Sequence, residues 1–319
     1  MAIQILLLLL GLILILLGAN WLVDGSSSIA KKAGVSEFII GLTIVGIGTS
    51  MPELVVSCTG AFQGNADIAI GNIIGSNIFN TFLILGVTAC ICPMVITSGN
   101  RKRDLPLHLL VTLLLIGFGM KKTIFGFGAN EVSRIDGIIM LVLFAVYLYL
   151  SFKNDNTEGE DSSTTKEYKT AVAIVMIIIG FAALIGGGQL FVNSAVNLAK
   201  SWGVSDKFIA ITILAGGTSL PELATCIVAA KKSKAQLALG NIIGSNIANI
   251  LLILGACAVI HPLSFQNITV IDISAVIVAA AFLLACALIF RKRSKIGLPE
   301  GIILLLMEAT YMFLLIKTM

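Results

Sequence analysis

The chain is dominated by uninterrupted apolar stretches, the first of which runs from Ala2 to Val23 without a charged residue. Hydrophobic residues make up 57% of the 319 residues and charged residues only 12%, whereas soluble domains average about 25% charged residues. About 20 consecutive apolar residues are enough to cross a bilayer as an α-helix. Strands of a membrane barrel are shorter and alternate in polarity, so they do not fit this pattern. We therefore expect an all-α integral membrane protein.

Ten such stretches fall into two sets of five, separated by a polar segment. They lie at about 2–23, 37–62, 67–92, 105–120, 135–152, 170–192, 207–230, 236–260, 270–290 and 299–316. The separating segment has five acidic residues, three lysines and no apolar run, which is typical of a solvated loop. We predict a first five-helix unit over 1–152, a cytoplasmic linker over 153–169 and a second five-helix unit over 170–319. A regulatory calcium site in the linker is the less favoured interpretation.

The lysine and arginine residues are unevenly distributed between the loops. If the ten stretches cross the membrane in turn, 15 of the 21 cations fall on one side. Cytoplasmic loops are the ones enriched in Lys and Arg, so we expect both termini on the outer side of the cell membrane. The N-terminal stretch lacks a preceding cationic segment and a small-residue cleavage site, which predicts a retained helix. The membrane topology thus accounts for the net charge of +4, and we expect no nucleic-acid partner. We expect the chain to be a monomer in contact with lipid.

Two motifs occur twice at a constant separation. The first reads GLTIVGIGTSMPELVVS from Gly41 and AITILAGGTSLPELATC from Ala210, and the second reads GNIIGSNIFN from Gly71 and GNIIGSNIAN from Gly240. Both shifts equal 169 residues, and the halves align without a gap from about residue 19 to 80. Because each half holds an odd number of spans, the second half enters the membrane in the opposite orientation. This is the inverted-repeat architecture of secondary transporters, whose binding sites lie near the midplane where the repeats meet.

A glutamate stands in the second stretch of each half, Glu53 in GTSMPE and Glu222 in GTSLPE. An ionisable side chain at this depth costs at least about 2.5 kcal/mol and is by default a functional hypothesis. One such residue could be a protonated glutamate bonded to a neighbouring helix, but two in equivalent motifs indicate a shared site. Glu308 in the last stretch has no counterpart 169 residues earlier, and there the purely structural role is favoured.

Each glutamate directly follows a proline, which interrupts helical hydrogen bonding. Pro52 and Pro221 have no amide proton to offer the carbonyl four residues back, and the preceding Met51 and Leu220 are pushed away from helical dihedrals. We expect a broken helix whose freed carbonyls line an ion site. Carboxylates, hydroxyls and carbonyls bind hard cations such as Ca²⁺ and Na⁺, whereas transition metals would require nearby Cys or His. Four hydroxyl residues stand at the two breaks: Thr49, Ser50, Thr218 and Ser219.

The third stretch of each half combines a polar stripe with a small-residue pattern. Side chains four residues apart lie on one face of a helix, and GxxxG patterns allow another helix to approach closely. Together these features predict a ligand-bearing face brought against the broken helix. The stripes are Asn72, Ser76 and Asn80 in one half and Asn241, Ser245 and Asn249 in the other, and the glycines are Gly71 and Gly75, then Gly240 and Gly244.

The paired GTSxPE and GNxxGSNxxN motifs resemble those of the calcium/cation antiporter superfamily, specifically the prokaryotic type of its sodium/calcium exchanger family. The resemblance covers both halves and implies a compact bundle of ten transmembrane helices, arranged as two inverted five-helix repeats, around a central cluster of cation sites. It implies Glu53 and Glu222 as shared calcium ligands, and it attributes alternating access to the first helix of each half sliding against a fixed core. For sodium it implies Thr49, Ser50, Thr218, Ser219, Ser76, Ser245 and the carbonyls of Gly46 and Ala215, with Asn80 and Asn249 completing the centre.

The residues around these motifs bear on the identity of the exchanged ions. Some relatives, including potassium-dependent exchangers, have Asp where Asn249 stands, so the missing negative charge argues against potassium co-transport. Relatives that use protons tend to replace the Thr-Ser pair before Pro-Glu, and this chain retains both pairs. A secondary active antiporter that exchanges Ca²⁺ for Na⁺ across the cytoplasmic membrane is therefore favoured, and exchange against H⁺ or another cation is the alternative.

Two other classes of membrane protein are less favoured. A passive cation channel would need an open axial pore, which inverted repeats around an occluded two-carboxylate site do not predict. A membrane enzyme would need catalytic motifs, and the chain has no HExxH, no GxSxG and no paired intramembrane aspartates. The six cysteines are expected to be small buried hydrophobes, and Cys90 and Cys92 lack the partners of a zinc site. We expect no catalytic residue and no cofactor, with Ca²⁺ and Na⁺ as the transported ions.

Overall fold

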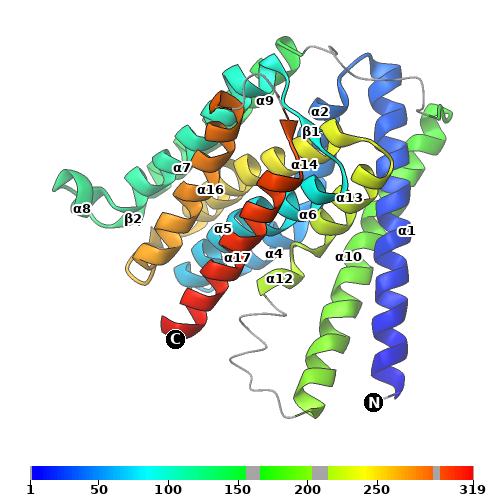
Figure 1. The fold of residues 1–319 in the computed structure, drawn as a ribbon. Coiled ribbons are helices and arrows are strands. Elements are labelled where there is room, and N and C mark those ends of the chain that lie inside the picture. Colours follow the sequence, from blue (N-terminus) through cyan, green and yellow to red (C-terminus); the bar gives the residue numbers. More distant parts are fainter. Residues whose placement is uncertain (1, 156–165, 203–214, 290–294, 319) are drawn as a thin grey trace.

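The computed structural model describes residues 2–155, 166–202, 215–289 and 295–318, and these ranges are almost entirely helical (Figure 1). Within them, seven helices are long and apolar enough to cross a membrane, and a bent helix pair is an eighth candidate. The expected all-α membrane class is confirmed. Before the linker the elements are α1 (Ala2–Ala33), α2 (Glu37–Ile40), η1 (Gly41–Val45), α3 (Gly46–Thr49), α4 (Met51–Phe62), α5 (Ala66–Phe79), η2 (Asn80–Ile84), α6 (Leu85–Ile91), β1 (Met94–Val95), η3 (Asn100–Asp104), α7 (Leu105–Gly119), α8 (Lys121–Phe125), β2 (Glu131–Val132) and α9 (Arg134–Lys153), where η marks a π-helical turn.

The elements after the linker repeat much of this order. The stretch predicted over 207–230 is described only from Ala215 onward, since residues 203–214 lie outside the described part of the chain. The elements are α10 (Thr170–Ser201), α12 (Ala215–Gly217), α13 (Leu220–Lys231), α14 (Ala235–Ala248), η6 (Asn249–Leu254), α15 (Gly255–Ile260), β3 (Leu263–Ser264), α16 (Val270–Ile289), β4 (Lys295–Ile296) and α17 (Leu298–Thr318).

α1 and α10 are longer than the apolar stretches that predict them. The first apolar stretch ends at residue 23 but α1 continues to Ala33, and the sixth ends at 192 but α10 continues to Ser201. A charged residue can lie within a helix beyond its apolar stretch when it forms an ion pair. Asp24 of α1 forms an ion pair of 2.7 Å with Lys232 at the end of α13, so the helix extends past the apolar boundary.

α1 and α10 lie side by side and antiparallel at one edge of the molecule (Figure 1). A Cβ atom on Gly11 would lie 2.8 Å from the carbonyl oxygen of Gly187, and one on Gly18 would lie 2.7 Å from that of Gly180. These distances leave no room for a side chain, so glycine is what allows the two backbones to meet. The 169-residue shift relates the two contacts, because it carries residue 11 onto 180 and residue 18 onto 187.

Two short antiparallel ribbons connect the part of the chain before α10 with the part after it. β1 pairs with β4 through Met94 and Ile296, and β2 pairs with β3 through Val132 and Leu263. Met94 and Leu263 are themselves related by the 169-residue shift. Each ribbon therefore joins the loop after a third helix to the loop before the last helix of the other half.

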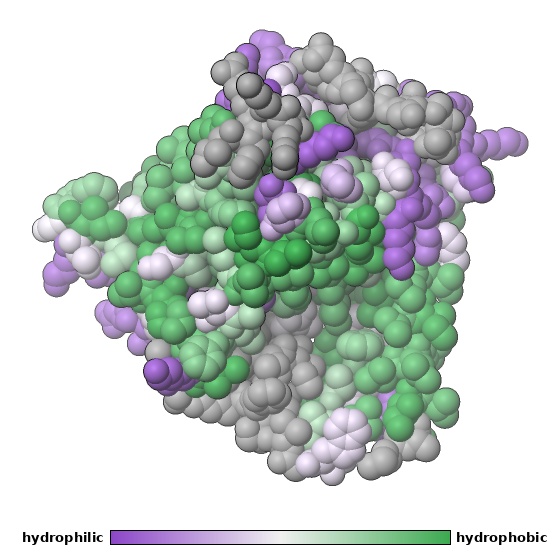
Figure 2. Space-filling model, in the orientation of Figure 1, coloured by the Kyte–Doolittle hydropathy of each residue, from purple (hydrophilic) through white to green (hydrophobic). Residues whose placement is uncertain are grey.

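The surface separates an apolar flank from a polar end. Hydrophobic residues cover most of the side of the molecule shown in Figure 2, and hydrophilic residues gather at the end where α1 finishes and α13 passes into α14. Lys31 and Lys32 belong to the last turn of α1, and Lys231 ends α13. Both chain termini lie at the opposite end (Figure 1). α14 crosses the centre of the bundle, where its residues from Gln236 to Ala248 are all buried.

Candidate ion-binding site

The bent helix formed by α2, η1, α3 and α4 positions the first glutamate. α3 and α4 meet at Ser50, whose φ of −81° and ψ of 9° depart from the helix, and the two segments differ in direction by 47°. The equivalent Ser219 has φ −89° and ψ 8° before α13. The expectation that Met51 and Leu220 leave helical dihedrals is wrong, because they begin α4 and α13. Each proline then stands in the first turn, where a missing N–H leaves no helical bond unmade.

Two buried carboxylates accept hydrogen bonds from serines of the opposite half. Ser50 Oγ donates to Glu222 Oε1 at 3.1 Å, and Ser219 Oγ donates to Glu53 Oε1 at 3.0 Å. Each glutamate is only 1% exposed. The 169-residue shift carries one of these bonds onto the other. Each helix break therefore supports the carboxylate of the other half, and the two glutamates belong to one cluster.

The serines and threonine of the predicted ligand set connect this pair to the third helix of each half. Ser76 Oγ of α5 donates to Glu53 Oε1 at 3.3 Å, and Ser245 Oγ of α14 donates to the carbonyl oxygen of Gly46 at 3.1 Å. Thr49 Oγ1 donates to Asn241 Oδ1 at 3.2 Å. The predicted contact between the polar stripes and the broken helix is thus present.

Glycines of α14 explain how closely the first broken helix approaches. A Cβ atom on Gly240 would overlap the carbonyl oxygen of Phe38, and one on Gly244 would lie 2.6 Å from the Cα atom of Leu42. This confirms the predicted role of the second GxxxG pattern. In the first pattern, a Cβ on Gly71 would meet no described atom within 4 Å, and the segment equivalent to α2 and η1 falls within the undescribed range 203–214.

Asparagine side chains form hydrogen bonds between the third helices of the two halves at the centre of the bundle. Asn80 Nδ2 donates to Asn246 Oδ1 at 3.2 Å, and Asn249 Nδ2 donates to Asn77 Oδ1 at 2.9 Å. Asn80 and Asn249 each begin a π-helical turn, η2 and η6, a feature that is frequent at functional sites. Sequence reasoning missed both the π-helical turns and the role of Asn77 and Asn246. The repetition of these two asparagines in both GSN motifs was the available signal.

The remaining stripe asparagines hold the third helices against the second helices. Asn72 Nδ2 donates to Ser57 Oγ at 3.0 Å and to the carbonyl oxygen of Glu53 at 3.3 Å. In the other half, Asn241 Nδ2 donates to Cys226 Sγ at 3.2 Å. Ser57 and Cys226 occupy equivalent positions, so a sulfur atom stands where the first half has an oxygen. Sequence reasoning identified neither acceptor.

Several buried oxygens of the cluster have no hydrogen-bond partner. Among them are Glu53 Oε2, Glu222 Oε2, Asn80 Oδ1 and Asn249 Oδ1. A buried acceptor without a partner is costly and calls for an explanation, and carboxylate and amide oxygens are ligands of Ca²⁺ and Na⁺. In the described ranges, no group of three or more His, Cys, Asp or Glu side chains is placed to hold a metal. The cluster thus has the composition of a hard-cation site built from two carboxylates and neutral oxygens.

A cavity of about 530 Å³ reaches the edge of this cluster between α4, α10 and α13. Its lining is mostly apolar, with Pro52 and Val192 among the lining residues, but Asn72 and Thr218 also face it. Thr218 is half-buried beside the second break. Ala215 begins α12, and no contact of its carbonyl oxygen belongs to the described structure. Glu308 of α17 is buried, and no hydrogen bond of the described residues joins it to the cluster.

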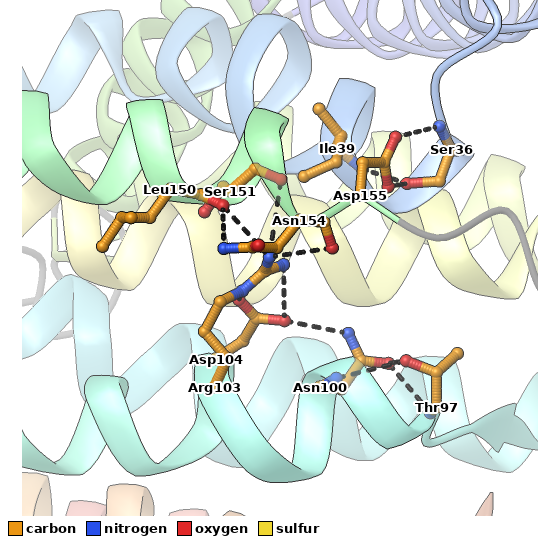
Figure 3. A network of polar contacts seen from close by, with 10 residues as sticks. All are labelled: Ser36, Ile39, Thr97, Asn100, Arg103, Asp104, Leu150, Ser151, Asn154 and Asp155. Carbon is orange, nitrogen blue, oxygen red and sulfur yellow. Dashed lines mark hydrogen bonds and ion pairs between the residues drawn. The ribbon is translucent and has the colours of Figure 1, made fainter.

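The helical segment α2–η1–α3, which leads to Glu53, is held at its N-cap residue Ser36 (Figure 3). Asp155 accepts hydrogen bonds from Ser36 N at 2.8 Å and Ser36 Oγ at 2.6 Å, and Ser36 is the N-cap of α2. Arg103 pairs with Asp104 at 2.8 Å. The Arg103 Nη1 atom also donates to carbonyl oxygens at the end of α9, those of Leu150, Ser151 and Asn154. The start of the linker is thereby held against α2 and η3.

The end of the linker is held against α1. Tyr168 N donates to Ser28 Oγ at 3.0 Å, and Glu167 forms an ion pair of 2.8 Å with Lys31. The hydrogen bond and the charge of Lys31 lower the pKa of the Glu167 carboxyl below its ordinary value. Of the five acidic residues that a calcium site in the linker would draw on, Asp155 and Glu167 bond to Ser36 and Lys31. The other three, Glu158, Glu160 and Asp161, lie outside the described residues.

Comparison with known proteins identifies the family to which the chain belongs. The family model described as sodium/calcium exchanger protein matches residues 3–153 and 172–317. The chain belongs to the sodium/calcium exchanger family. The sodium/calcium exchanger MaX1 of Methanosarcina acetivorans is 32% identical over 98% of either chain, and an uncharacterized membrane protein of Methanocaldococcus jannaschii is 39% identical over 93% of either chain. A solved structure of the sodium-calcium exchanger NCX_Mj, soaked with Na⁺ and Ca²⁺, has a TM-score of 0.81 at 35% identity and covers 98% of this chain and 97% of its own.

Membership of the sodium/calcium exchanger family confirms the resemblance that the paired motifs carry. It also establishes the chain as a multi-pass membrane transport protein, in agreement with its long apolar helices.

Proposed function

We propose that this exchanger family member is a secondary active antiporter that moves Ca²⁺ and Na⁺ in opposite directions by alternating access. The observation that carries the proposal is the buried pair of Glu53 and Glu222, each held by a serine of the other half and each with one carboxylate oxygen unpartnered. MaX1 and NCX_Mj, which match nearly the whole chain, carry the name of sodium/calcium exchangers.

We propose that the two carboxylates are shared between the two ions. Glu53 and Glu222 would bind Ca²⁺ directly, and their negative charges would make an empty site costly in the low-dielectric centre of the bundle. Ca²⁺ and Na⁺ would compete for overlapping oxygens, so that each displaces the other, and exchange follows. The proposed sodium ligands are the buried or half-buried hydroxyls of Thr49, Ser50, Thr218, Ser219, Ser76 and Ser245, the carbonyls of Gly46 and Ala215, and, at the centre, Asn80 and Asn249.

We further propose a fold of ten transmembrane helices in two inverted repeats, 1–152 and 170–319, joined by a cytoplasmic linker over 153–169. The exchanged serine–glutamate bonds support this, because a shift of 169 residues carries one onto the other, and the two β ribbons support it because each joins equivalent loops of the two halves. The two separate matches of the family model fall on either side of the linker. The cationic end of the bundle would face the cytoplasm and both termini the outside. The chain would act as a monomer in lipid, without a cofactor and without enzymatic activity.

Exchange of Ca²⁺ for H⁺ is the second candidate function. The unpartnered oxygens of Glu53 and Glu222 could carry protons as well as cations. The neutral hydroxyls of Ser50 and Ser219, which both contact these carboxylates, favour Na⁺ because they add oxygen ligands that a proton does not need.

The test uses the full chain in proteoliposomes, with ⁴⁵Ca uptake driven by either an imposed Na⁺ gradient or an imposed pH gradient. We expect uptake with the Na⁺ gradient, and loss of this uptake in Glu53→Gln and in Glu222→Gln. Glu308→Gln is the matched control, since it also removes a buried intramembrane carboxylate but lies outside the cluster, and it should transport. Sodium-driven uptake in the Glu53→Gln protein would refute the shared-carboxylate site. Uptake that responds only to the pH gradient would select the second candidate.

A further inference from the structure

Two cysteines from opposite halves meet near one end of the bundle. Cys58 of α4 and Cys257 of α15 have their Sγ atoms 3.7 Å apart. Cys257 is completely buried, whereas Cys58 is half-buried. The duplication does not impose this pair, because the equivalent positions hold Ile227 and Thr88. Neither sulfur bonds to any residue of the ion-binding cluster in the described structure.

Both cysteines lie about one helical turn from the end of their helices. α4 ends at Phe62 and α15 at Ile260, and a helix rises about 1.5 Å per residue. The loops that follow these helices are adjacent, since a Cβ atom on Gly64 would lie 3.9 Å from His261 Nε2. Under the proposed orientation this end faces the outside, where disulfides persist. The cysteine pair thus lies near the outer end of the bundle, close to an oxidising solution and away from the membrane centre.

We propose that Cys58 and Cys257 form a reversible disulfide that links the two halves of the exchanger near its outer end. The sulfurs need to approach by less than about 2 Å to reach the bond length of about 2.05 Å. The oxidant is another disulfide, either of a small molecule or of an oxidoreductase of the outer compartment.

The chemistry proceeds by two thiol–disulfide exchanges. The half-buried Cys58 loses its proton, and its thiolate attacks one sulfur of the oxidant, which forms a mixed disulfide and releases one thiol. The thiolate of Cys257 then attacks Cys58 Sγ, breaks the mixed disulfide and releases the second thiol. The two cysteines lose two electrons in total, and one oxidant disulfide is reduced to two thiols.

The consequence is a covalent bond between two halves that are otherwise joined by packing, hydrogen bonds and the two β ribbons. The linked positions are 199 residues apart, and a cross-link that closes so long a loop restricts the unfolded chain strongly. The oxidised protein should therefore have a higher thermal unfolding midpoint than the reduced protein, and a reductant should reverse this shift.

The experiment treats the purified full-length protein, reduced and reconstituted in lipid, with oxidised glutathione. Free thiols are counted by alkylation and intact mass after denaturation, and the linked peptides are then mapped. Of the six cysteines, we expect four to remain free, with a Cys58–Cys257 peptide that dithiothreitol removes. Cys58→Ser should keep its five free thiols after the same treatment. The matched control Cys286→Ser, which removes a buried cysteine elsewhere, should lose two.

Three outcomes would overturn the proposal. They are six free thiols in the treated wild-type protein, a glutathione adduct on Cys58 that does not resolve to the linked peptide, and a linked peptide that contains another cysteine. The peptide map of the wild-type protein decides between these results even if a serine variant fails to fold. Because no readout involves ion transport, failure here would leave the proposed exchange function untouched.

Discussion

The contact between α14 and η1 allows a quantitative test of how the first half-helix is positioned. In Gly244→Ala, the new Cβ would overlap the carbonyl oxygen of Leu42 and lie 2.6 Å from its Cα atom. Carbon atoms prefer a separation of about 3.5–4.0 Å, so η1 must move away from α14 by about 1 Å. Overpacking of this kind costs about 1–3 kcal/mol.

The same displacement would separate two hydrogen bonds of the site. These are Ser245 Oγ to the Gly46 carbonyl at 3.1 Å and Thr49 Oγ1 to Asn241 Oδ1 at 3.2 Å. Each is worth about 0.5–1.5 kcal/mol, which brings the total loss of stability to about 2–6 kcal/mol. Because these two bonds position ion ligands, the loss of both, about 1–3 kcal/mol together, should lower the apparent Ca²⁺ affinity by roughly 5- to 150-fold.

The assay combines a thermal unfolding midpoint with the concentration dependence of sodium-driven ⁴⁵Ca uptake. The control is Gly186→Ala on α10, where a Cβ would meet no described atom within 4 Å, and neither measurement should change beyond error. A Gly244→Ala protein with the wild-type midpoint and wild-type Ca²⁺ dependence would refute the claim that α14 sets the position of η1.

Two further substitutions test the residues that support the cluster. Asp155→Asn weakens the hydrogen bonding of Ser36, because an amide has one acceptor oxygen in place of the two that bind Ser36 N and Oγ. The thermal unfolding midpoint should fall by an amount equivalent to about 1–2 kcal/mol. An unchanged midpoint would show that these bonds contribute no stability. Cys226→Ser gives Asn241 an oxygen acceptor like the one that Asn72 has in Ser57. Cys226→Ala leaves the Asn241 amide unpaired, at a cost of about 1–3 kcal/mol. The serine variant should therefore unfold at a higher temperature than the alanine variant. Equal midpoints for the two variants would contradict this interpretation.

The parts of the fold that sequence could predict are those governed by local rules. Apolar length predicts membrane helices, and seven helices and one bent pair of the described residues are long and apolar enough. The 169-residue shift pairs Glu53 with Glu222 before any coordinate is known. Proline chemistry predicts that each helix breaks, although the break falls at Ser50 and Ser219 and not at the residues before proline. That difference of one residue reflects the tolerance of a helical first turn for proline.

The parts that sequence could not predict depend on which helices meet. The serine of one break contacts the glutamate of the other half, and no spacing within one half contains this information. The π-helical turns at Asn80 and Asn249 add a residue to a helix that looks regular in sequence. For the same reason the sequence predicts only a small buried hydrophobe at Cys226, since its partner Asn241 lies on another helix.

The glycine contacts between α1 and α10 restrict how the two longest helices can move. Gly11 meets Gly187 and Gly18 meets Gly180 at backbone distance. A shift of one helix along the other by a single residue would bring Ile179 or Phe181 of α10 against Gly18, whereas Gly186 or Gly188 would still leave a glycine opposite Gly11. The pair is therefore held in one register and would move as a single body. Because each half contributes one of these helices, opening a path on one face of the membrane and closing it on the other would be the same displacement. Under the proposed alternating access, this constraint would keep the two paths from being open together, so that ions would not leak through the protein down their gradients.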